Sequence, residues 1–294
     1  RKIAKMILLA EKSLIVEYWN YFLPVVIGII IFTYLDSRKK TKSQPGASAK
    51  KLDGEEYIGE LFSGGNVEEE AFTPALEEKE HVPFSGATVT LEGGANKFYE
   101  IMNDRRSVRS YSKKPVPFEV IEACIKAAGT APSGAHTEPW TFCVISDPEI
   151  KSQIRDIIEA EEFLNYNQRM HKQWRTDLRP LKTYHVKEYL TDAPYLILIF
   201  KQTYGSRSDG KRKQHYYNEI SVSIATGILL SSLQAAGLSS LVTTPLNCGP
   251  ALRTLLDRPQ NEKLLVLLPV GHPAENCTVP NLKRKNIEEI LVRY

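Results

Sequence analysis

Apolar residues recur with the 3.6-residue period of an amphipathic helix in four parts of this chain, which predicts four helices. The predicted helices cover residues 97–103, 118–128, 148–170 and 216–236. The third has a clear start, because Asp147 can cap it and Pro148 suits its first turn. The fourth is apolar on almost every side between Ile220 and Ala236, so we expect it to be buried, either in the domain centre or between subunits.

Short apolar runs rich in β-branched and aromatic residues alternate with these helices and predict strands. The predicted strands cover residues 141–145, 195–200, 241–244 and 264–270. Helices and strands are therefore interspersed, but the strands are few. This pattern indicates a protein of mixed α and β structure built around one modest sheet.

The N-terminal part follows a different pattern. Residues 19–35 are an uncharged run of 17 residues, close to the length that crosses a bilayer core of about 30 Å as a helix. A basic stretch follows the run instead of a small-residue cleavage site, so a transmembrane anchor is favoured over a signal peptide. A buried helix of a soluble protein is the remaining alternative. Four basic residues stand on each side of the run, and only the unpaired cysteines favour a cytoplasmic catalytic domain.

Residues 36–96 are rich in Gly, Ser, Pro and charge. From Asp53 to Glu80 there are ten acidic residues and one basic residue. Such a segment buries little apolar surface, so we expect a flexible charged tether. Residues 1–18 receive no assignment, and residues 97–294 have the composition and length of a globular domain.

Charge and motifs exclude several classes of protein. Lysine and arginine number 38 against 35 acidic residues, and this balance gives no support for nucleic-acid binding. The four cysteines contain no CxxC pair, and the six histidines have no metal-ligand spacing. The chain also lacks the GxGxxG, GxxxxGK[ST], GxSxG and HExxH motifs, so the fingerprints of dinucleotide and nucleotide-triphosphate binding are absent and hydrolase and metalloenzyme functions are disfavoured.

Three segments can carry chemistry. Residues 105–109 (RRSVR) place three guanidinium groups and a hydroxyl together, which suits a phosphate; a solvated basic helix end is the alternative. Residues 131–140 (APSGAHTEPW) are small and turn-forming, so backbone can approach a ligand closely, unless this is an ordinary loop. Residues 243–247 (TTPLN) end a predicted strand, where a hydroxyl can face a ligand.

The strings RRSVR and APSGAHTEPW together resemble the nitroreductase superfamily of flavin mononucleotide (FMN) enzymes, over about residues 81–294. The further strings HYYNEISVSIATGILL, TTPLNCGPALR, EKLLVLLPVGHP and VPNLKRK are similar to a member that acts on iodinated tyrosines. The resemblance implies an α+β fold with a mixed sheet flanked by helices, as an intertwined homodimer with flavin at its interface. It implies reductive dehalogenation of mono- and diiodotyrosine to tyrosine and iodide. NADPH would be the ultimate reductant, with a separate reductase delivering the electrons.

The resemblance also implies which residues contact FMN. The segment that would hold the phosphate and ribityl chain consists of Arg105, Arg106, Ser107, Val108 and Arg109. Arg284 would add a phosphate contact, from the same or the partner subunit. The residues that would line the isoalloxazine ring are Pro132, Ser133, Val242, Thr243 and Thr244. The Thr244 hydroxyl would lie near flavin N5 and favour one-electron chemistry.

For the substrate, the resemblance implies Glu162, Tyr166 and Lys187. Glu162 and Tyr166 are four residues apart, so one face of a helix presents both. Glu162 and Lys187 offer an anion and a cation to an amino-acid zwitterion, and the backbone N–H of Ala135 would bind the phenolate oxygen. For Glu162, the alternative is one acid of an exposed acidic helix. The polar segment around residues 165–187 predicts a lid that orders over bound substrate.

Two other functions stay open. One is a general nitro- or quinone reductase on the same fold, which would not need Glu162 and Lys187. The other is a membrane-tethered module that binds flavin or halotyrosine without turnover.

Overall fold

The structure is a computed structural model that describes residues 76–77, 79–84, 86, 92–207 and 210–294. The segments predicted as residues 1–18 and as the anchor 19–35 lie outside these described residues, as does the predicted tether up to residue 75. Within the described part, no helix combines the length and apolarity needed to cross a membrane. The first described helix, α3 (Gly94–Asn103), begins three residues before the predicted domain boundary at residue 97.

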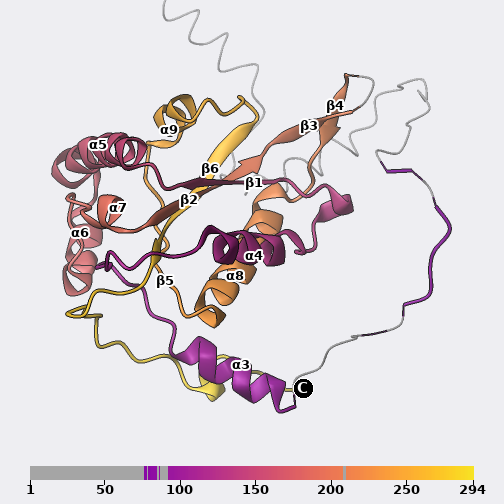
Figure 1. Cartoon of the computed structure of the whole chain (residues 1–294), viewed down its shortest axis with the longest axis horizontal. Helices are drawn as coiled ribbons and strands as arrows, with labels where there is room; N and C mark the ends of the chain where they lie inside the picture. Colours follow the sequence, from indigo (N-terminus) through magenta and orange to yellow (C-terminus); the bar gives the residue numbers. More distant parts are fainter. Residues whose placement is uncertain (1–75, 78, 85, 87–91, 208–209) are drawn as a thin grey trace, which may run out of the picture. The chain divides into compact units, whose positions relative to one another are not determined.

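A four-stranded sheet lies at the centre of the fold (Figure 1). Its strands, in spatial order, are β1 (Trp140–Ile145), β2 (Tyr195–Gln202), β6 (Glu262–Gly271) and β5 (Ser239–Ser240). These strands pair antiparallel throughout. Parallel pairing occurs in the isolated bridge between Ser107 and Ser240, so the mixed character expected for the sheet is confined to this edge.

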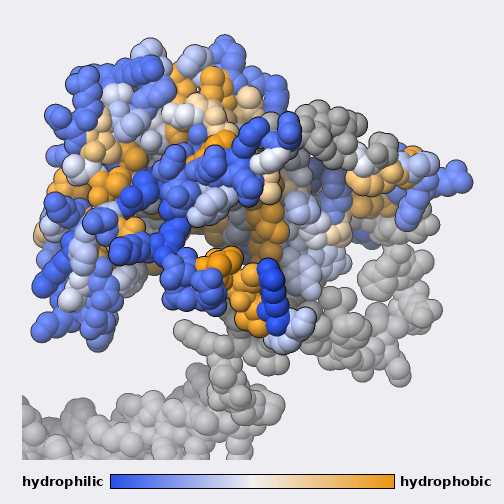
Figure 2. Space-filling model, turned by 90° about the horizontal axis from the view of Figure 1, so that it is seen from below, coloured by the Kyte–Doolittle hydropathy of each residue, from blue (hydrophilic) through white to orange (hydrophobic). Residues whose placement is uncertain are grey.

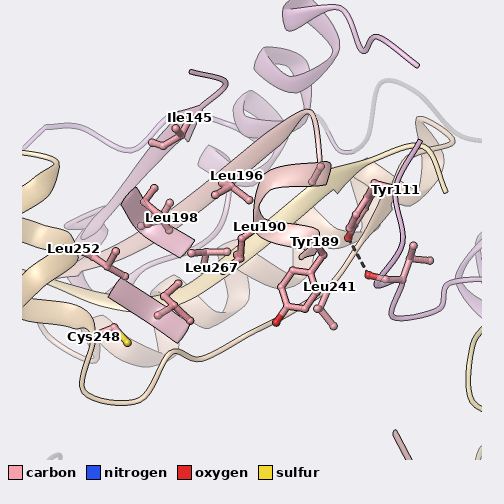
Figure 3. Close-up of a cluster of buried hydrophobic side chains, with 14 of the residues drawn as sticks. Tyr111, Ile145, Tyr189, Leu190, Leu196, Leu198, Leu241, Cys248, Leu252 and Leu267 are labelled. Carbon is pink, nitrogen blue, oxygen red and sulfur yellow. Dashed lines mark hydrogen bonds between the residues drawn. The ribbon is translucent and has the colours of Figure 1, made fainter. Parts of the chain in front are cut away.

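Side chains of β2 alternate between two buried layers, one on each face of the sheet. On one face Leu196, Leu198 and Phe200 pack into a cluster shown in Figure 3. This layer is covered by α5 (Pro148–Leu164), α7 (Tyr189–Asp192) and α9 (Gly249–Leu255). On the other face Ile197 and Ile199 pack beneath α4 (Phe118–Gly129) and α8 (Asn218–Ala235). Since both faces are covered, β2 is apolar at consecutive positions rather than alternating with polar residues.

The prediction of a strand over residues 241–244 is wrong in its bounds. Strand β5 ends at Ser240, and beyond it Thr243 makes an isolated bridge to Leu267. The register places Leu241 opposite Pro269, where the Leu241 N–H donates to the Pro269 carbonyl at 3.3 Å. Proline has no N–H to return, so the ladder is interrupted at this position.

The helix predicted over residues 148–170 is α helical only to Leu164. It continues as one π-helical turn, η2 (Asn165–Arg169), in which the Met170 N–H donates to the Asn165 carbonyl at 2.8 Å. The lid segment then contains α6 (Lys172–Leu178) and the short η3 (Arg179–Leu181), neither of which was predicted. Also unpredicted are the hairpin β3 (Tyr204–Ser206) with β4 (Arg212–Gln214), the turn η4 (Ile287–Glu289), α7 and α9.

Helix α8 is buried on one side only within this chain, although its sequence predicts burial all round. Val222 and Leu229 are fully buried, whereas Ile220 is 59% exposed and Ile224 is 42% exposed. Figure 2 shows the face seen from below, where separate apolar patches lie among predominantly polar residues. The expectation that the domain centre buries this helix on every side is therefore wrong for Ile220 and Ile224.

Candidate active site

A cavity of about 660 Å³ lies between the lid segment and the loop that follows β5. Of the residues predicted from the sequence, it is lined by Arg109, Glu162, Tyr166, Lys187, Val242, Thr243 and Thr244. The fold thus brings together residues from four separate parts of the chain. These include all three side chains predicted to bind substrate.

Glu162, Tyr166 and Lys187 converge on one wall of the cavity. Glu162 lies in the last turn of α5, Tyr166 follows in the π-helical turn, and Lys187 stands just before α7. The Lys187 Nζ lies 3.2 Å from Glu162 Oε2 and 5.5 Å from the centroid of the Tyr166 ring. The Tyr166 hydroxyl donates to the Thr183 carbonyl at 3.2 Å, which ties the two ends of the lid together.

The Glu162–Lys187 ion pair is largely removed from water. Its two side chains are 15% and 7% exposed, respectively. Burial lowers the pKa of Lys187, and the Glu162 carboxylate acts in the opposite direction. Burial also raises the pKa of the Tyr166 phenol. A buried ion pair can exchange partners with a zwitterion and leave both charges compensated, whereas losing one partner leaves a buried charge alone.

The loop after β5 lines the cavity with residues 241–247. The isolated bridge at Thr243, with N–H···O distances of 3.0 and 2.8 Å to Leu267, fixes the backbone there. Val242 and Thr244 on either side are exposed. The Thr244 hydroxyl has no hydrogen-bond partner within the described part of the chain, so it is available to a ligand.

Of the RRSVR segment, Arg109 lines the cavity, whereas Arg105, Arg106 and Ser107 are not among the described residues that line it. The Val108 N–H donates to the Ser240 carbonyl at 3.2 Å, which attaches the segment to the sheet edge beside β5. The Val108 side chain itself is buried in the core, and the Tyr111 hydroxyl donates to its carbonyl at 3.0 Å (Figure 3). Any ligand contact of Val108 is therefore made by its backbone.

Arg284 reaches the same region from the C-terminal end. Its guanidinium donates to the Asn103 carbonyl at 2.8 Å and to the Arg105 carbonyl at 2.9 Å, while Arg106 donates to the Pro280 carbonyl. Among the residues that the structure describes, Arg105, Arg106 and Arg284 have no carboxylate partner. The three guanidinium groups therefore carry an uncompensated positive charge, which suits a phosphate monoester.

The APSGAHTEPW segment lies elsewhere. Pro132, Ser133 and Ala135 are not among the described residues that line the cavity. Ala135 lies in the turn η1 (Gly134–His136), and Pro132 and Ser133 directly precede it. This turn is held against the start of α8, where the Gly134 N–H donates to Ser221 Oγ at 3.3 Å. Within one chain the predicted site is therefore divided into two parts.

The η1 turn has a specific shape. A Cβ on Gly134 would lie 2.7 Å from the Tyr216 carbonyl oxygen, so the close packing of this turn requires glycine. The Glu138 N–H donates to Ser133 Oγ at 3.0 Å. Ala135 has a φ of 48°, which is rare for a residue with a side chain. The Ala135 N–H has no hydrogen-bond partner in the described part of the chain and so can donate to a ligand.

Several cavity residues were not predicted. Asn165 is 1% exposed, and its Nδ2 lies 3.4 Å from Glu162 Oε1 and 3.5 Å from the Leu246 carbonyl. Trp174 and Leu178 line the cavity from α6, and their spacing of four residues is a helical signal that could have revealed an apolar inner face. No local pattern in the sequence distinguishes Asn165.

Comparisons with known proteins agree with this arrangement. The pattern of the Nitroreductase family matches residues 102–272. The chain is 67% identical over 223 residues to "Iodotyrosine deiodinase" of Drosophila melanogaster, covering 75% of this chain and 78% of the relative. It is 59% identical over 280 residues to "Iodotyrosine deiodinase 1" of Mus musculus, covering 92% of this chain and 98% of the relative.

The fold is similar to a crystal structure of oxidized iodotyrosine deiodinase bound to FMN and 3-iodo-L-tyrosine. That comparison has a TM-score of 0.56 and 32% sequence identity, and covers 67% of this chain and 98% of the other. The family match extends over more than half of the present sequence. This protein, an α+β oxidoreductase by fold, belongs to the nitroreductase family.

Proposed function

We propose that this chain is an FMN-dependent enzyme that removes iodide reductively from mono- and diiodotyrosine and releases tyrosine, a reaction of iodide salvage. The observation that carries this proposal is the buried Glu162–Lys187 pair beside the Tyr166 ring. It offers one anion, one cation and one flat apolar surface, which are the groups that an aromatic amino acid requires. The names of the relatives at 67% and 59% identity support the same reaction.

The residues present fit FMN. Its phosphate requires cations without competing carboxylates, which Arg105, Arg106 and Arg284 provide, and Ser107 and Arg109 lie in the same segment. The unpartnered Thr244 hydroxyl is available to the ring system. When bound, reduced FMN would supply two electrons per iodine removed, which together with one proton replace the carbon–iodine bond by a carbon–hydrogen bond and release iodide.

The protein residues bind and orient the substrate. Glu162 accepts hydrogen bonds from the substrate ammonium, Lys187 donates to its carboxylate, and the Tyr166 ring packs against the tyrosine framework. The Ala135 N–H donates to the phenolate oxygen, where it stabilises negative charge as electrons enter the ring. Closure of the lid, residues 165–187, excludes water from this step.

We also propose that the site is completed in a homodimer. Pro132, Ser133 and Ala135 would come from the second subunit, since within one chain they do not reach the cavity. The exposed apolar face of α8, with Ile220 and Ile224, adjoins the η1 turn through Ser221 and is suited to a subunit interface. The two halves of the site and this apolar face support the same assembly.

The remaining parts of the proposal rest on the sequence. Residues 19–35 would anchor the enzyme in a membrane by a single span, with residues 36–96 as a tether and residues 97–294 on the cytoplasmic side. The electrons would come ultimately from NADPH. Because the chain has no dinucleotide-binding fingerprint, a separate reductase would deliver them.

Replacing Arg284 by alanine should weaken FMN binding about 10- to 100-fold, because a charge-assisted contact to phosphate contributes about 1.5–3 kcal/mol. The Kd for FMN, from quenching of flavin fluorescence in a titration of apoprotein, measures this. Arg293→Ala is the matched control, since Arg293 is an exposed arginine near the same end of the chain. Equal FMN affinities for the Arg284→Ala variant and the wild type would exclude Arg284 from the phosphate site.

The proposed reaction is tested by reoxidation of the reduced flavoprotein without oxygen. Diiodotyrosine should restore the absorbance of oxidised flavin, whereas tyrosine, which carries no iodine, should not. If nitroarenes reoxidise the flavin and diiodotyrosine does not, the protein is a general reductase instead. If diiodotyrosine binds tightly without reoxidation, it is a binding module.

A further inference from the structure

Two carboxylates of α5 contact Lys187, one at its side-chain ammonium and the other at its backbone N–H. Glu162 pairs with the side-chain ammonium at 3.2 Å. Glu159 accepts a hydrogen bond from the backbone N–H of the same lysine, with an N···O distance of 2.6 Å. The two glutamates are three residues apart on the helix and therefore lie on neighbouring positions of one face.

Glu159 is itself held in place by Arg155. The Arg155 Nε donates to Glu159 Oε1 at 2.7 Å, and its Nη1 donates to Thr191 Oγ1 of α7 at 3.0 Å. The side chains of Arg155 and Glu159 are 26% and 24% exposed, so this pair is partly shielded from water. Arg155, Glu159 and Thr191 thus link α5 to α7, and we call this set of contacts the brace.

This brace spans the two ends of the lid. Glu159 lies on α5 before the lid begins, and Lys187 is the last residue of the lid. The Lys187 ammonium changes partners when a substrate carboxylate arrives, but the Glu159 contact is to the backbone and does not involve the substrate. The lysine can therefore exchange its ion-pair partner while its Cα stays in place. A hydrogen bond from an amide to a carboxylate is stronger than one between neutral groups, which suits this task.

We propose that Glu159, supported by Arg155, is a positioning residue that fixes Lys187 and thereby sets the affinity of the site for zwitterionic amino acids. The inference rests on the proposed function, in which Lys187 binds the substrate carboxylate. Glu159 does not touch the substrate, so its effect depends on whether the ligand uses Lys187. A ligand without ammonium and carboxylate groups gains nothing from the brace.

The experiment compares two ligands on the FMN-loaded full chain. 3-Iodotyrosine carries both charges, and 2-iodophenol keeps the iodinated phenol alone. In the Glu159→Ala variant, the Kd of iodotyrosine should rise about 10- to 100-fold, while that of iodophenol stays within about twofold of the wild type. Glu159→Gln should restore part of the affinity, because its amide oxygen can still accept the Lys187 N–H. Asp156→Ala, an exposed acid on the same helix, should change neither Kd.

Hydrogen exchange provides a second readout that needs no ligand. In the Glu159→Ala variant, amides of residues 183–188 should exchange at least about tenfold faster, and in Asp156→Ala they should not. Equal losses of affinity for both ligands, or an unchanged iodotyrosine Kd, would overturn the proposal. If the alanine variant does not fold, the glutamine variant is compared with the wild type in the same way. A wild type that does not bind iodotyrosine contradicts the proposed function, and the exchange rates then still decide whether Glu159 fixes Lys187.

Discussion

Replacing Lys187 by methionine should reduce kcat/KM for diiodotyrosine by at least about 100-fold. The substitution removes the cation that binds the substrate carboxylate and leaves Glu162 alone in a site where its side chain is 15% exposed. Removing one partner of a buried ion pair destabilises the protein by about 3–5 kcal/mol. Part of this penalty persists in the complex, because the carboxylate of the bound ligand then lacks a partner. Initial rates of iodide release measure the loss.

The same variant should keep the chemistry that does not need a zwitterion. FMN content and the rate of nitroarene reduction should stay within about twofold of the wild type, since Lys187 serves the amino-acid end of the ligand.

The charge argument also predicts a change in substrate preference. Lys187→Met should prefer iodotyramine, which has only the ammonium, and Glu162→Gln should prefer the iodinated hydroxyphenylpropionate, which has only the carboxylate. Unchanged iodotyrosine turnover in Lys187→Met would contradict the proposed role of this residue.

Replacing Ile224 by arginine should convert the proposed dimer to a monomer without FMN and without deiodinase activity. Ile224 is 42% exposed on the apolar face of α8, where a charge would have to be buried in the proposed interface. Because Ala135 and Ser133 would then lack the opposite subunit, no complete site would remain. Light scattering, flavin absorbance and iodide release measure the three losses. Ser152→Arg, on an exposed position of α5, is the control and should remain an active dimer.

A mixture of two inactive variants tests the same point without a substitution on the apolar face of α8. Ala135→Pro removes the N–H donor, because proline has none. It also changes the η1 turn locally, because proline cannot adopt the φ of 48° found there, but it leaves Ile220 and Ile224 of α8 unaltered. In a heterodimer of Ala135→Pro and Lys187→Met, one of the two sites would contain only wild-type residues. Refolding the variants together should therefore restore activity. Failure to restore it would place Ala135 and Lys187 of the same chain in one site and contradict the shared site.

The periodic segments were the predictable part of the fold. Strands β1, β2 and β6 and helices α4, α5 and α8 follow from sequence patterns that packing on the sheet reinforces. The short helices α7 and α9 carry too few periodic positions to be recognised. The end of β5 depends on the proline opposite Leu241, on a strand distant in the sequence. Such pairings are not visible from local pattern.

The candidate site was predictable to a different degree at each residue. Spacing alone places Glu162 and Tyr166 on one helix face, but the approach of Lys187 required the resemblance and then the fold. Glu159 could not be distinguished from neighbouring acids, because its role is set by the backbone N–H of Lys187 at the far end of the lid. The division of the site between η1 and the cavity likewise depends on tertiary structure.

The central claim is tested most directly by product analysis after a single turnover. Residues 81–294 with bound FMN would be reduced with dithionite without oxygen and mixed with diiodotyrosine, and iodide and 3-iodotyrosine, the product that has lost one iodine, would be measured together. The account predicts that both products appear in proportion to the reduced flavin, and that neither appears without protein. A dimeric flavoprotein that binds diiodotyrosine, becomes reoxidised by a nitroarene and releases no iodide would contradict it.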